Sequence, residues 1–386
     1  MIKNLFTIKR IIIIAINVLC LIAFFICLGI SSSIRTPLRS QQAANAWAGQ
    51  SGERYSQISA FFEVPSAFDM DGIRQLRSNL NSALLEAALE SSEDTILYTD
   101  AWSSKTTLTV MSQRSNQFSI KAVAVGGDFF VFHPLNLRDG SYLSPNDVMK
   151  DRVVIDEELA WRLFGAVKVA GFEIIINNRP FVVSGVITRE KDFAGSAAYK
   201  QFAGDEAFAF GAGLFMTYDA LVDMTEGTAR IETYEIVLPN PISGFAMTTF
   251  EKTLNNPAAH LVENTSRFTL GKMFDLIGSF GERSMRNDAL VFPYWENAAR
   301  YAEDWLAFIL ILSIIFLIFP VVSVIIYIVI LIRFGVKHAK LAIKNLIKKK
   351  DDRAYEKFIQ KHSEDFDAND DYSLNDIIRE VNDEIY

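Results

Sequence analysis

Histidine is the residue type in this chain best suited to metal binding or proton transfer near neutral pH. The sequence holds four: His133, His260, His338 and His362. A zinc or similar site needs several His, Cys, Asp or Glu ligands at short, recognisable spacings, and none of the four has such a neighbour. We therefore expect ordinary surface or core histidines and no metal site.

Close acidic pairs could supply general acid–base catalysis, and the candidates are Asp69 with Asp71 and Glu157 with Glu158. Each pair stands where a turn or the start of a helix is expected. Carboxylates are favoured there because they accept hydrogen bonds from unpaired N–H groups and suit the positive end of the helix dipole. We predict helix-start roles; the alternative, an acid–base site in a surface hydrolase, has no nucleophile motif beside it.

Nucleotide hydrolysis and cysteine chemistry are not supported by the sequence. A phosphate-binding loop requires G-x-x-x-x-G-K-[ST], but Gly271-Lys272 is followed by Met273. Cys20 and Cys27, the two cysteines, both lie in one apolar run, which excludes a disulfide framework or a cysteine metal site in the rest of the chain. We predict that the chain is not an enzyme and has no catalytic, cofactor-binding or metal-binding residues and no cofactor.

The composition indicates a membrane protein with a large water-facing part. The 386 residues are 50% hydrophobic and 22% charged, with a mean hydropathy of +0.17. Such a chain is too apolar for an ordinary soluble enzyme and too charged for a polytopic transporter. The net charge of −8 argues against nucleic acid as a partner, because phosphate binding needs a basic face.

Two uncharged apolar runs, residues 11–30 and 305–332, are long enough to cross a bilayer as transmembrane helices 1 and 2. The alternative for the first is a cleaved signal peptide, which would have a shorter apolar core and a small-x-small site close behind it. Pro320 should kink the second helix, since it removes a backbone donor. Asn17 is expected to bond a neighbouring helix; the alternative is that it simply tolerates its place in the apolar run.

The charges that flank these spans predict their orientation. Residues 1–10 hold Lys3, Lys9 and Arg10, and residues 333–350 hold a further run of Lys and Arg. By the positive-inside rule both termini are cytoplasmic. Residues 31–304 then lie outside, and the chain is predicted to reside in the cell (plasma or inner) membrane.

Residues 31–304 are predicted to form an α+β domain, and we expect two subdomains within it. Within residues 138–165, turns are expected at 138–140 and 144–147, a strand at 153–155, and a helix that Asp156 caps and Gly165 ends. A hairpin over 172–188 should turn at Asn177-Asn178. Further elements are expected as strands at 54–64, 105–112, 118–127 and 231–239, helices at 71–90 and 246–254, a strand followed by a helix at 214–224, and a mobile loop at 192–213.

A stalk helix is predicted to join this domain to the second span. Trp295, Ala298, Ala302 and Trp305 fall on one helical face. No Gly or Pro interrupts residues 294–332 before Pro320. We expect one continuous helix; the alternative is a separate amphipathic surface helix.

The motifs of residues 123–187 carry a family resemblance. In order they are Gly127-Asp128-Phe129-Phe130, Asp139-Gly140, Asp147-Val148, Val153-Val154-Ile155, Leu159–Gly165 and Ile174–Ile187. This order resembles the periplasmic core domain of MacB-type ABC transporter permeases, of the FtsX/LolC-like superfamily, over roughly residues 54–260. Family permeases usually have one span before this domain and three after it, so the chain resembles a reduced form with two transmembrane helices. The resemblance implies an ABC-type ATP-binding subunit and other permease subunits as partners.

The C-terminal part is predicted to hold two amphipathic helices. In residues 333–350, one stripe is basic (Lys337, Lys340, Lys344, Lys348) and another is apolar (Val336, Ala339, Ile343, Leu346, Ile347). This helix suits anionic lipid headgroups or, by analogy with the family, a contact with an ATPase. The acidic tail, residues 351–386, ends in "SLNDIIREVNDEIY", whose apolar face we expect to dock on a cytoplasmic subunit.

These expectations favour a noncatalytic permease-like subunit of an ABC transporter complex, which couples a partner ATPase to the extracytoplasmic domain. ATP hydrolysis would then belong to the partner. The alternative is a membrane-anchored extracytoplasmic binding or sensing protein without an ATPase partner.

Overall fold

The computed structural model describes residues 2–49, 52–63, 67–89, 96–113, 115–188, 193–196, 213–284, 292–362 and residue 379. The chain divides into two compact units, one formed by Ile22–Ile315 and the other by Met1–Leu21 with Phe316–Tyr386. The predicted loop at 192–213 and the predicted tail helix at 373–386 lie almost entirely outside the described residues.

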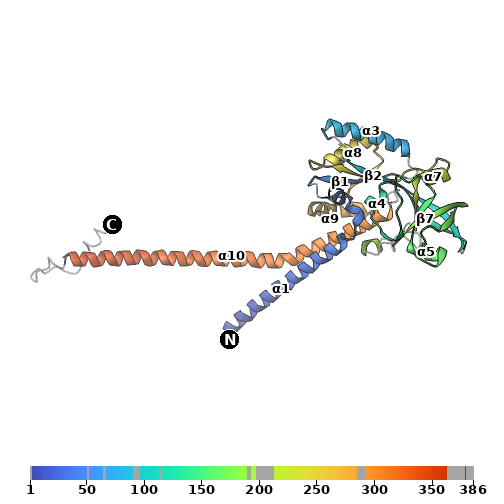
Figure 1. The fold of residues 1–386 in the computed structure, drawn as a ribbon. Coiled ribbons are helices and arrows are strands. Elements are labelled where there is room, and N and C mark those ends of the chain that lie inside the picture. Colours follow the sequence, from blue (N-terminus) through green and yellow to red (C-terminus); the bar gives the residue numbers. More distant parts are fainter. Residues whose placement is uncertain are drawn as a thin grey trace, which may run out of the picture. The chain divides into compact units, whose positions relative to one another are not determined.

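A mixed sheet of ten strands forms the centre of the unit Ile22–Ile315 (Figure 1). The strands are β1 (Tyr55–Phe61), β2 (Thr99–Ser112), β3 (Ser115–Gly127), β4 (Asn136–Gly140), β5 (Arg152–Asp156), β6 (Glu173–Ile176), β7 (Arg179–Thr188), β8 (Leu214–Thr217), β9 (Thr233–Pro239) and β10 (His260–Glu263). Their order is β10-β1-β9-β2-β3-β8-β5-β7-β4, and β6 pairs with both β2 and β7. Only the β3–β8 and β5–β7 pairs of this described sheet are parallel. The described strands of this unit form one sheet, and the unit is not divided into the two subdomains that we expected.

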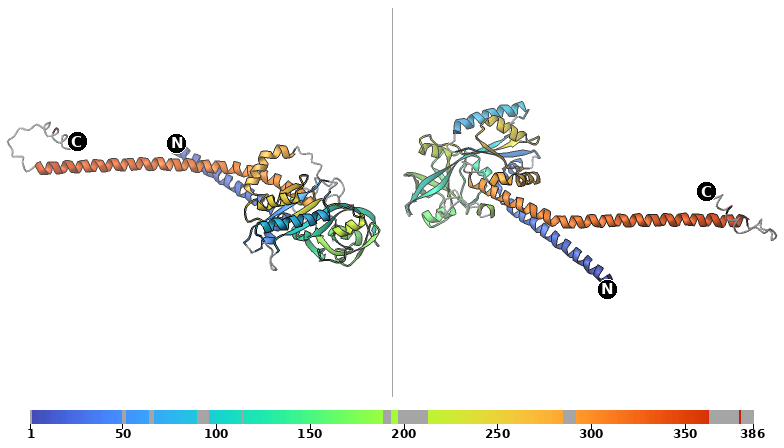
Figure 2. Two further views of the ribbon diagram at one scale, coloured as in Figure 1. Left: turned by 90° about the horizontal axis from the view of Figure 1, so that it is seen from above. Right: turned by 180° about the vertical axis from the view of Figure 1, so that it is seen from behind.

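Helices cover both faces of the sheet. The helical elements are α1 (Ile2–Arg35), the 3₁₀ turn η1 (Arg39–Gln41), α2 (Ala43–Ala48), α3 (Met70–Glu86), α4 (Phe129–Phe132), α5 (Glu157–Phe164), α7 (Tyr218–Met224), α8 (Phe245–Leu254), α9 (Leu270–Ser284) and α10 (Tyr294–His362). Helices α3 and α8 contact each other on one face (Figures 1 and 2). On the other face, Ala43 of α2, Phe132 of α4 and Trp295 of α10 belong to a second apolar cluster.

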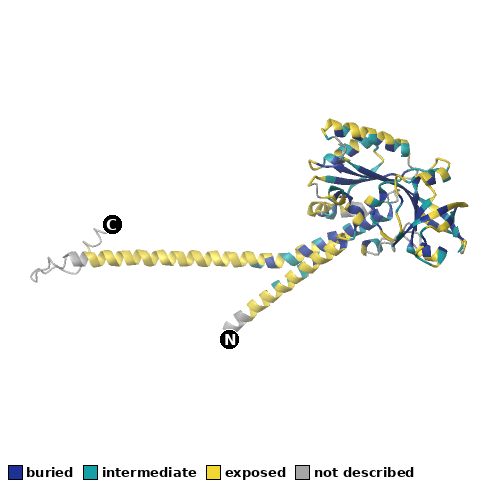
Figure 3. Ribbon diagram, in the orientation of Figure 1, coloured by how far each residue is buried: buried dark blue, intermediate teal, exposed yellow. Residues whose placement is uncertain are grey.

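Strand β9 shows how the sheet serves two cores. Its side chains alternate between faces, as a strand requires. Tyr234, Ile236 and Leu238 pack with α3 and α8, whereas Val237 packs in the cluster around Trp295. All seven residues of β9 are buried, and Figure 3 shows the same burial along the central strands.

Local signals in the sequence were confirmed where turn chemistry is strong. The Asp156 carboxylate accepts a hydrogen bond from the N–H of Leu159 at 2.7 Å, and Gly165 ends α5 with φ +69°. Asn177 and Asn178 adopt φ +45° and +66° between β6 and β7, which the tight hairpin requires. The predicted strands and helices at 54–64, 71–90, 214–224, 231–239 and 246–254 are all present, with boundaries shifted by a few residues.

The turn predicted at Arg138-Asp139-Gly140 was wrong for its first two residues. Arg138 and Asp139 lie in β4, which pairs with β7 across a register shift between Leu137 and Asp139. Gly140 ends the strand with φ +69°, and a Cβ there would collide with the carbonyl oxygen of Ser184. The glycine thus permits β4 and β7 to lie close together. This close approach could not be predicted from the residues next to Gly140 in the sequence.

The second unit contains parts of the two apolar helices. Two helical stretches, Ile8–Arg35 and Tyr294–Lys357, are long and apolar enough to cross a membrane. Asn17 of α1 donates to Ser323 Oγ of α10 at 3.2 Å and to the Ile13 carbonyl at 2.8 Å. This confirms the prediction that Asn17 bonds a neighbouring helix. Pro320 lies inside α10, which continues without a break to His362.

Candidate functional site at the base of the stalk helix

The stalk helix α10 meets the sheet through a tryptophan and small residues. Trp295, Ala298 and Ala302 are buried, as their shared helical face predicted. Alanine side chains leave room for the helix backbone to lie close to its neighbours. Trp305 follows on this face but is 39% exposed, and its ring lies 5.6 Å from that of Phe193. The predicted continuous stalk is confirmed, since one helix runs from Tyr294 through the second apolar run.

Arg267, in the turn between β10 and α9, is the centre of a buried ion cluster. Its guanidinium donates two hydrogen bonds to the Glu296 carboxylate, at 2.6 and 2.8 Å, and one to Glu303 at 2.5 Å. Gln41 of η1 accepts a further bond at 3.1 Å, and Arg300 also donates to Glu296 at 2.8 Å. Two arginines thus face two glutamates, and with Gln41 the cluster joins three segments: η1, the turn before α9, and α10.

Burial makes this cluster sensitive to the loss of any partner. Arg267 is 5% and Glu296 1% exposed. Burial alone would lower the pKa of Arg267, but the charges of Glu296 and Glu303 outweigh it and raise that pKa above its usual value. Burial would raise the pKa of Glu296, but Arg267 and then Arg300 outweigh it and hold that pKa below its usual value. Arg267 and Glu296 therefore both remain charged near neutral pH.

Strand β1 holds both the segment that follows α1 and the turn whose Arg267 contacts α10. The Gln57 side chain of β1 donates to the Ser40 carbonyl at 2.7 Å and accepts from the Ala43 N–H at 2.9 Å, which fixes the chain just after α1. The Gln57 carbonyl accepts from the Asn264 N–H at 2.8 Å, and the Asn264 amide donates to Ser59 at 2.7 Å. The turn that carries Arg267 is thereby fixed to the same strand. In Figures 1 and 2 the last turns of α1 lie beside the first turns of α10.

A second buried polar pair lies against the first turn of α10. His133 Nε2 and Glu235 Oε2 are 2.5 Å apart, and the two residues are 3% and 2% exposed. Ser59 donates to the other Glu235 oxygen at 3.0 Å, and the His133 ring centroid lies 4.4 Å from that of Trp295. Within the described residues no group of three or more His, Cys, Asp and Glu could hold a metal ion. We refer to the Arg267 cluster, the Gln57 contacts and this pair together as the stalk joint.

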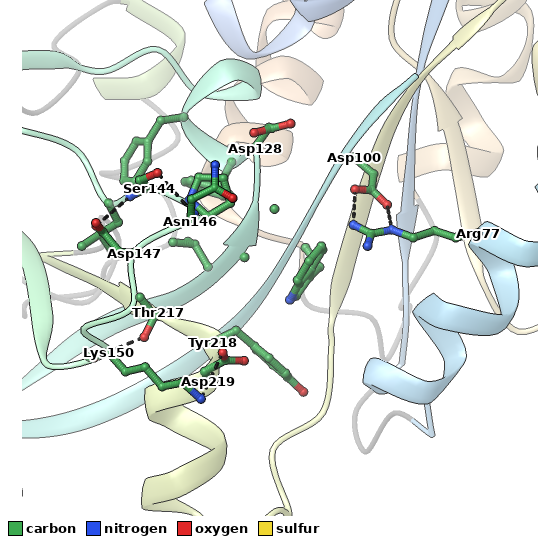
Figure 4. Close-up of a pocket in the computed structure, with 18 residues that line it drawn as sticks. Arg77, Asp100, Asp128, Ser144, Asn146, Asp147, Lys150, Thr217, Tyr218 and Asp219 are labelled. Carbon is green, nitrogen blue, oxygen red and sulfur yellow. Dashed lines mark hydrogen bonds and ion pairs between the residues drawn. The ribbon is translucent and has the colours of Figure 1, made fainter. Parts of the chain in front are cut away.

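A pocket of about 440 Å³ lies elsewhere in the domain, where β2 begins and β3 ends (Figure 4). On one side Arg77 donates to both Asp100 oxygens at 2.8 and 2.6 Å, and this hydrogen bonding raises the pKa of Arg77. On the other side Lys150 pairs with Asp219 at 3.3 Å, and Asp147 accepts from the Ser144 N–H at 3.1 Å.

The pocket lining is more acidic than basic. Its charged residues are Arg77, Lys150, Asp100, Asp128, Asp147 and Asp219. Its volume falls in the range of small-molecule sites, and aromatic residues, Trp102 among them, contribute to the walls. Gly126 has no side chain because a Cβ there would collide with the Trp102 indole. The arrangement suits a small polar molecule.

The residues that the sequence suggested for chemistry lie apart and serve the fold. Asp69 caps α3 by accepting from the N–H groups of Asp71 and Gly72 at 3.0 and 3.1 Å. Glu157 and Glu158 occupy the first turn of α5, as predicted. The stalk joint was missed, although Glu296, Arg300 and Glu303 recur at helical spacing beside an otherwise apolar face and could have indicated it.

A mixed sheet covered by helices, joined to two helices apolar enough for a membrane, defines a membrane-anchored α+β domain protein. The MacB-like periplasmic core domain family matches residues 11–243. The chain belongs to this family, whose domain occurs in permease-type proteins of ABC transporters, and it is a membrane protein with an extracytoplasmic domain.

Solved structures with similar folds are distant in sequence. The periplasmic region of MacB from Actinobacillus actinomycetemcomitans is 16% identical with a TM-score of 0.39, and the match covers 60% of this chain and 94% of that one. The extracellular domain of the noncanonic ABC-type transporter YknZ from Gram-positive bacteria is 15% identical with a TM-score of 0.36, covering 53% and 99%. A domain of a putative permease protein from Porphyromonas gingivalis is 12% identical with a TM-score of 0.29, covering 54% and 86%. A comparison with curated protein sequences finds no significant match.

Proposed function

We propose that this chain is a noncatalytic, permease-like membrane subunit of an ABC transporter complex. A partner ATP-binding subunit hydrolyses ATP in the cytoplasm, and the two membrane helices carry the resulting movement to the extracytoplasmic domain. Membership of the family supports this function. The basic flanks of the two apolar runs support an orientation with both termini in the cytoplasm.

In this proposal each segment has a defined place. Residues 1–10 are the cytoplasmic N-terminus, 11–30 and 305–332 cross the membrane, and 31–304 form the extracytoplasmic domain with its stalk. Residues 333–350 form the basic cytoplasmic helix, and 351–386 the acidic cytoplasmic tail. Other permease subunits complete the path for the transported molecule, because the apolar spans of this chain carry no charged residue.

The observation that carries the proposal is the stalk joint. A movement of α10 reaches the sheet only if the contact between them resists deformation. In this buried site, charged hydrogen bonds join Arg267 to Glu296 and Glu303. Hydrogen bonds between ionised groups are shorter and stronger than those between neutral groups. Gln57 ties the segment after α1 to the same strand that holds the Arg267 turn. A tilt of either helix is therefore transmitted to β1 instead of being absorbed by a loop.

Co-purification tests the proposal. The full chain, tagged and expressed at its native level, is purified in mild detergent and its partners are identified by mass spectrometry. We expect an ABC-type ATP-binding subunit in stoichiometric amount, and none with an unrelated two-span protein of the same membrane as a control. Repeated isolation of a stable preparation without an ATP-binding subunit would contradict the proposal.

A second function, that of a membrane-anchored binding or sensing protein without an ATPase partner, is favoured by the pocket of Figure 4. This alternative predicts that the chain purifies without an ATP-binding subunit. It also predicts that a small polar molecule raises the melting temperature of the full chain. This rise in melting temperature should disappear in Asp147→Asn, because Asp147 lines the pocket. It should persist in Asp71→Asn, because Asp71 does not line the pocket.

A further inference from the structure

Helix α10 presents an exposed amphipathic surface beyond the second apolar run. From Arg333 to Lys350 the segment has seven Lys and Arg residues and no acidic residue. Val336, Ile343, Leu346 and Ile347 are 50%, 56%, 67% and 56% exposed. We call the stripe of Val336, Ala339, Ile343, Leu346 and Ile347, with the adjoining Lys337, Lys340, Lys344 and Lys348, the basic face.

The course of the helix argues against a bilayer as the occupant of the basic face. A helix that binds headgroups lies in the plane of the interface. Here residues 316–362 form one helix with no break at Gly335, so the segment continues in the direction of the span. At 1.5 Å per residue, residues 333–362 extend about 45 Å beyond the apolar run. Most of the basic face is therefore held away from the headgroups, and its apolar stripe needs a protein partner.

The C-terminal tail of the same chain has the complementary chemistry. Residues 363–386 include nine acidic residues and one basic residue, Arg379. From Ser373 the sequence predicts a short helix with a capping residue and one apolar face, formed by Leu374, Ile377, Ile378, Val381 and Ile385. An acidic amphipathic helix matches the basic face in both its apolar stripe and its charge.

The length of the connecting segment permits the contact within one chain. Residues 363–372 span at most about 33 Å when extended, which equals the rise of about 22 helical residues. Ser373 therefore reaches the side of α10 at Ala354 with length to spare. A fourteen-residue helix that starts there and runs antiparallel ends beside Lys340, and it covers Lys344 and Lys348. A tether this short gives an effective concentration on the order of millimolar, which favours the chain's own tail over a second copy.

We propose that residues 373–386 fold back as a helix on the basic face of α10 in the same chain. The tail covers the apolar stripe, and its carboxylates pair with the lysines. The contact depends on this chain alone and does not require the proposed function.

Distance measurement between two spin labels in the full chain tests this proposal. Cys20 and Cys27 are replaced by alanine, and labels are attached at Asn345→Cys and Asn382→Cys, which the antiparallel arrangement brings side by side. By helical spacing Asn345 lies opposite the apolar stripe, so its label does not block the contact. With helix axes about 10 Å apart, we expect a narrow distribution near 20 Å in nanodiscs of neutral lipid.

Charge variants establish the cause of a short distance. Lys340→Glu, Lys344→Glu and Lys348→Glu together should shift the distribution beyond about 40 Å, because the tail is then repelled. Glu380→Lys and Glu384→Lys in the same chain, which flank the apolar stripe of the tail by helical spacing, should restore the short distance. A matched control, Lys357→Glu, leaves the basic face intact and should change nothing.

Three results would overturn the proposal. The first is a broad distribution of label-to-label distances beyond about 40 Å in the doubly labelled chain that carries none of the charge substitutions. The second is a short distance in a mixture of two singly labelled chains, which would assign the contact to a second copy. The third is loss of the short distance when the nanodiscs contain anionic lipid, which would assign the basic face to the membrane.

Discussion

Replacing Arg267 with methionine should destabilise the extracytoplasmic domain far more than removing an exposed arginine. Methionine keeps most of the volume but leaves the Glu296 carboxylate, 1% exposed, without its bidentate partner. Breaking a buried ion pair on one side costs about 3–5 kcal/mol, and Arg300 still offsets part of the charge, so we expect about 3 kcal/mol. For a domain of this size that corresponds to a fall in Tm of about 10 °C.

Thermal unfolding of the full chain in detergent, followed by tryptophan fluorescence, measures this change. Arg74→Met is the matched control, since its side chain is 70% exposed and pairs with the exposed Asp71. Such surface pairs contribute little, so the Tm of the control should equal that of the wild type within error. Arg267→Met with Glu296→Leu should recover most of the loss, because an apolar pair needs no counter-charge.

The pH dependence checks that charge is the cause. The pKa of Glu296 is lowered in the folded protein, so its stabilising contribution is present above the usual value of 4.5 and is lost as the pH falls through the folded pKa. In Arg267→Met this carboxyl group takes up a proton more readily, which relieves the buried charge. The Tm difference between wild type and variant should be full at pH 7 and narrow toward pH 4. An unchanged Tm at pH 7, or a difference that stays constant down to pH 4, would refute the electrostatic explanation.

Three further substitutions test local features. Gly140→Ala should lower the free energy of unfolding, measured by denaturant titration, by about 2 kcal/mol or more, because a Cβ at this φ of +69° would meet a carbonyl oxygen of β7. Gly165 has the same φ but no atom near its Cβ position, so Gly165→Ala should lower the free energy of unfolding by about 1 kcal/mol. Asp156→Ala removes the N-cap of α5 and should cost about 1 kcal/mol in the same titrations. Asn17→Ala removes the hydrogen bond to Ser323 and should weaken the association of the two apolar helices by about 0.6 kcal/mol, measured by steric trapping in bicelles; an equal effect of Asn17→Ala in a Ser323→Ala background would show that this bond does not contribute.

The sequence predicted elements whose signals are local. Asp156 and Gly165 bound α5 because a cap and a left-handed stop act over a few residues. The hairpin at Asn177-Asn178 follows from the conformation that asparagine tolerates. The stalk was predicted because Trp295 and Ala302 recur at the period of a helix.

Features that depend on contacts distant in the chain could not be predicted in this way. Strand β2 begins at Thr99, before the predicted residue 105, because it pairs there with β9. Strand β10 forms by pairing with β1, about 200 residues earlier in the chain. The ion cluster joins Arg267 to Glu296 and to Gln41, and only the glutamate side of it leaves a helical pattern in the sequence.

Hydrogen–deuterium exchange in the co-purified complex tests the coupling between ATP and the extracytoplasmic domain most directly. Exchange of residues 264–269 and 294–305, at the stalk joint, is compared without nucleotide and with ATP plus vanadate. If the spans transmit the movement, the exchange rates of these amides should change with nucleotide, although the proposed orientation puts them on the far side of the membrane from the ATP. Nucleotide-dependent exchange confined to the ATP-binding subunit, with the stalk joint unchanged, would contradict a role in mechanical coupling.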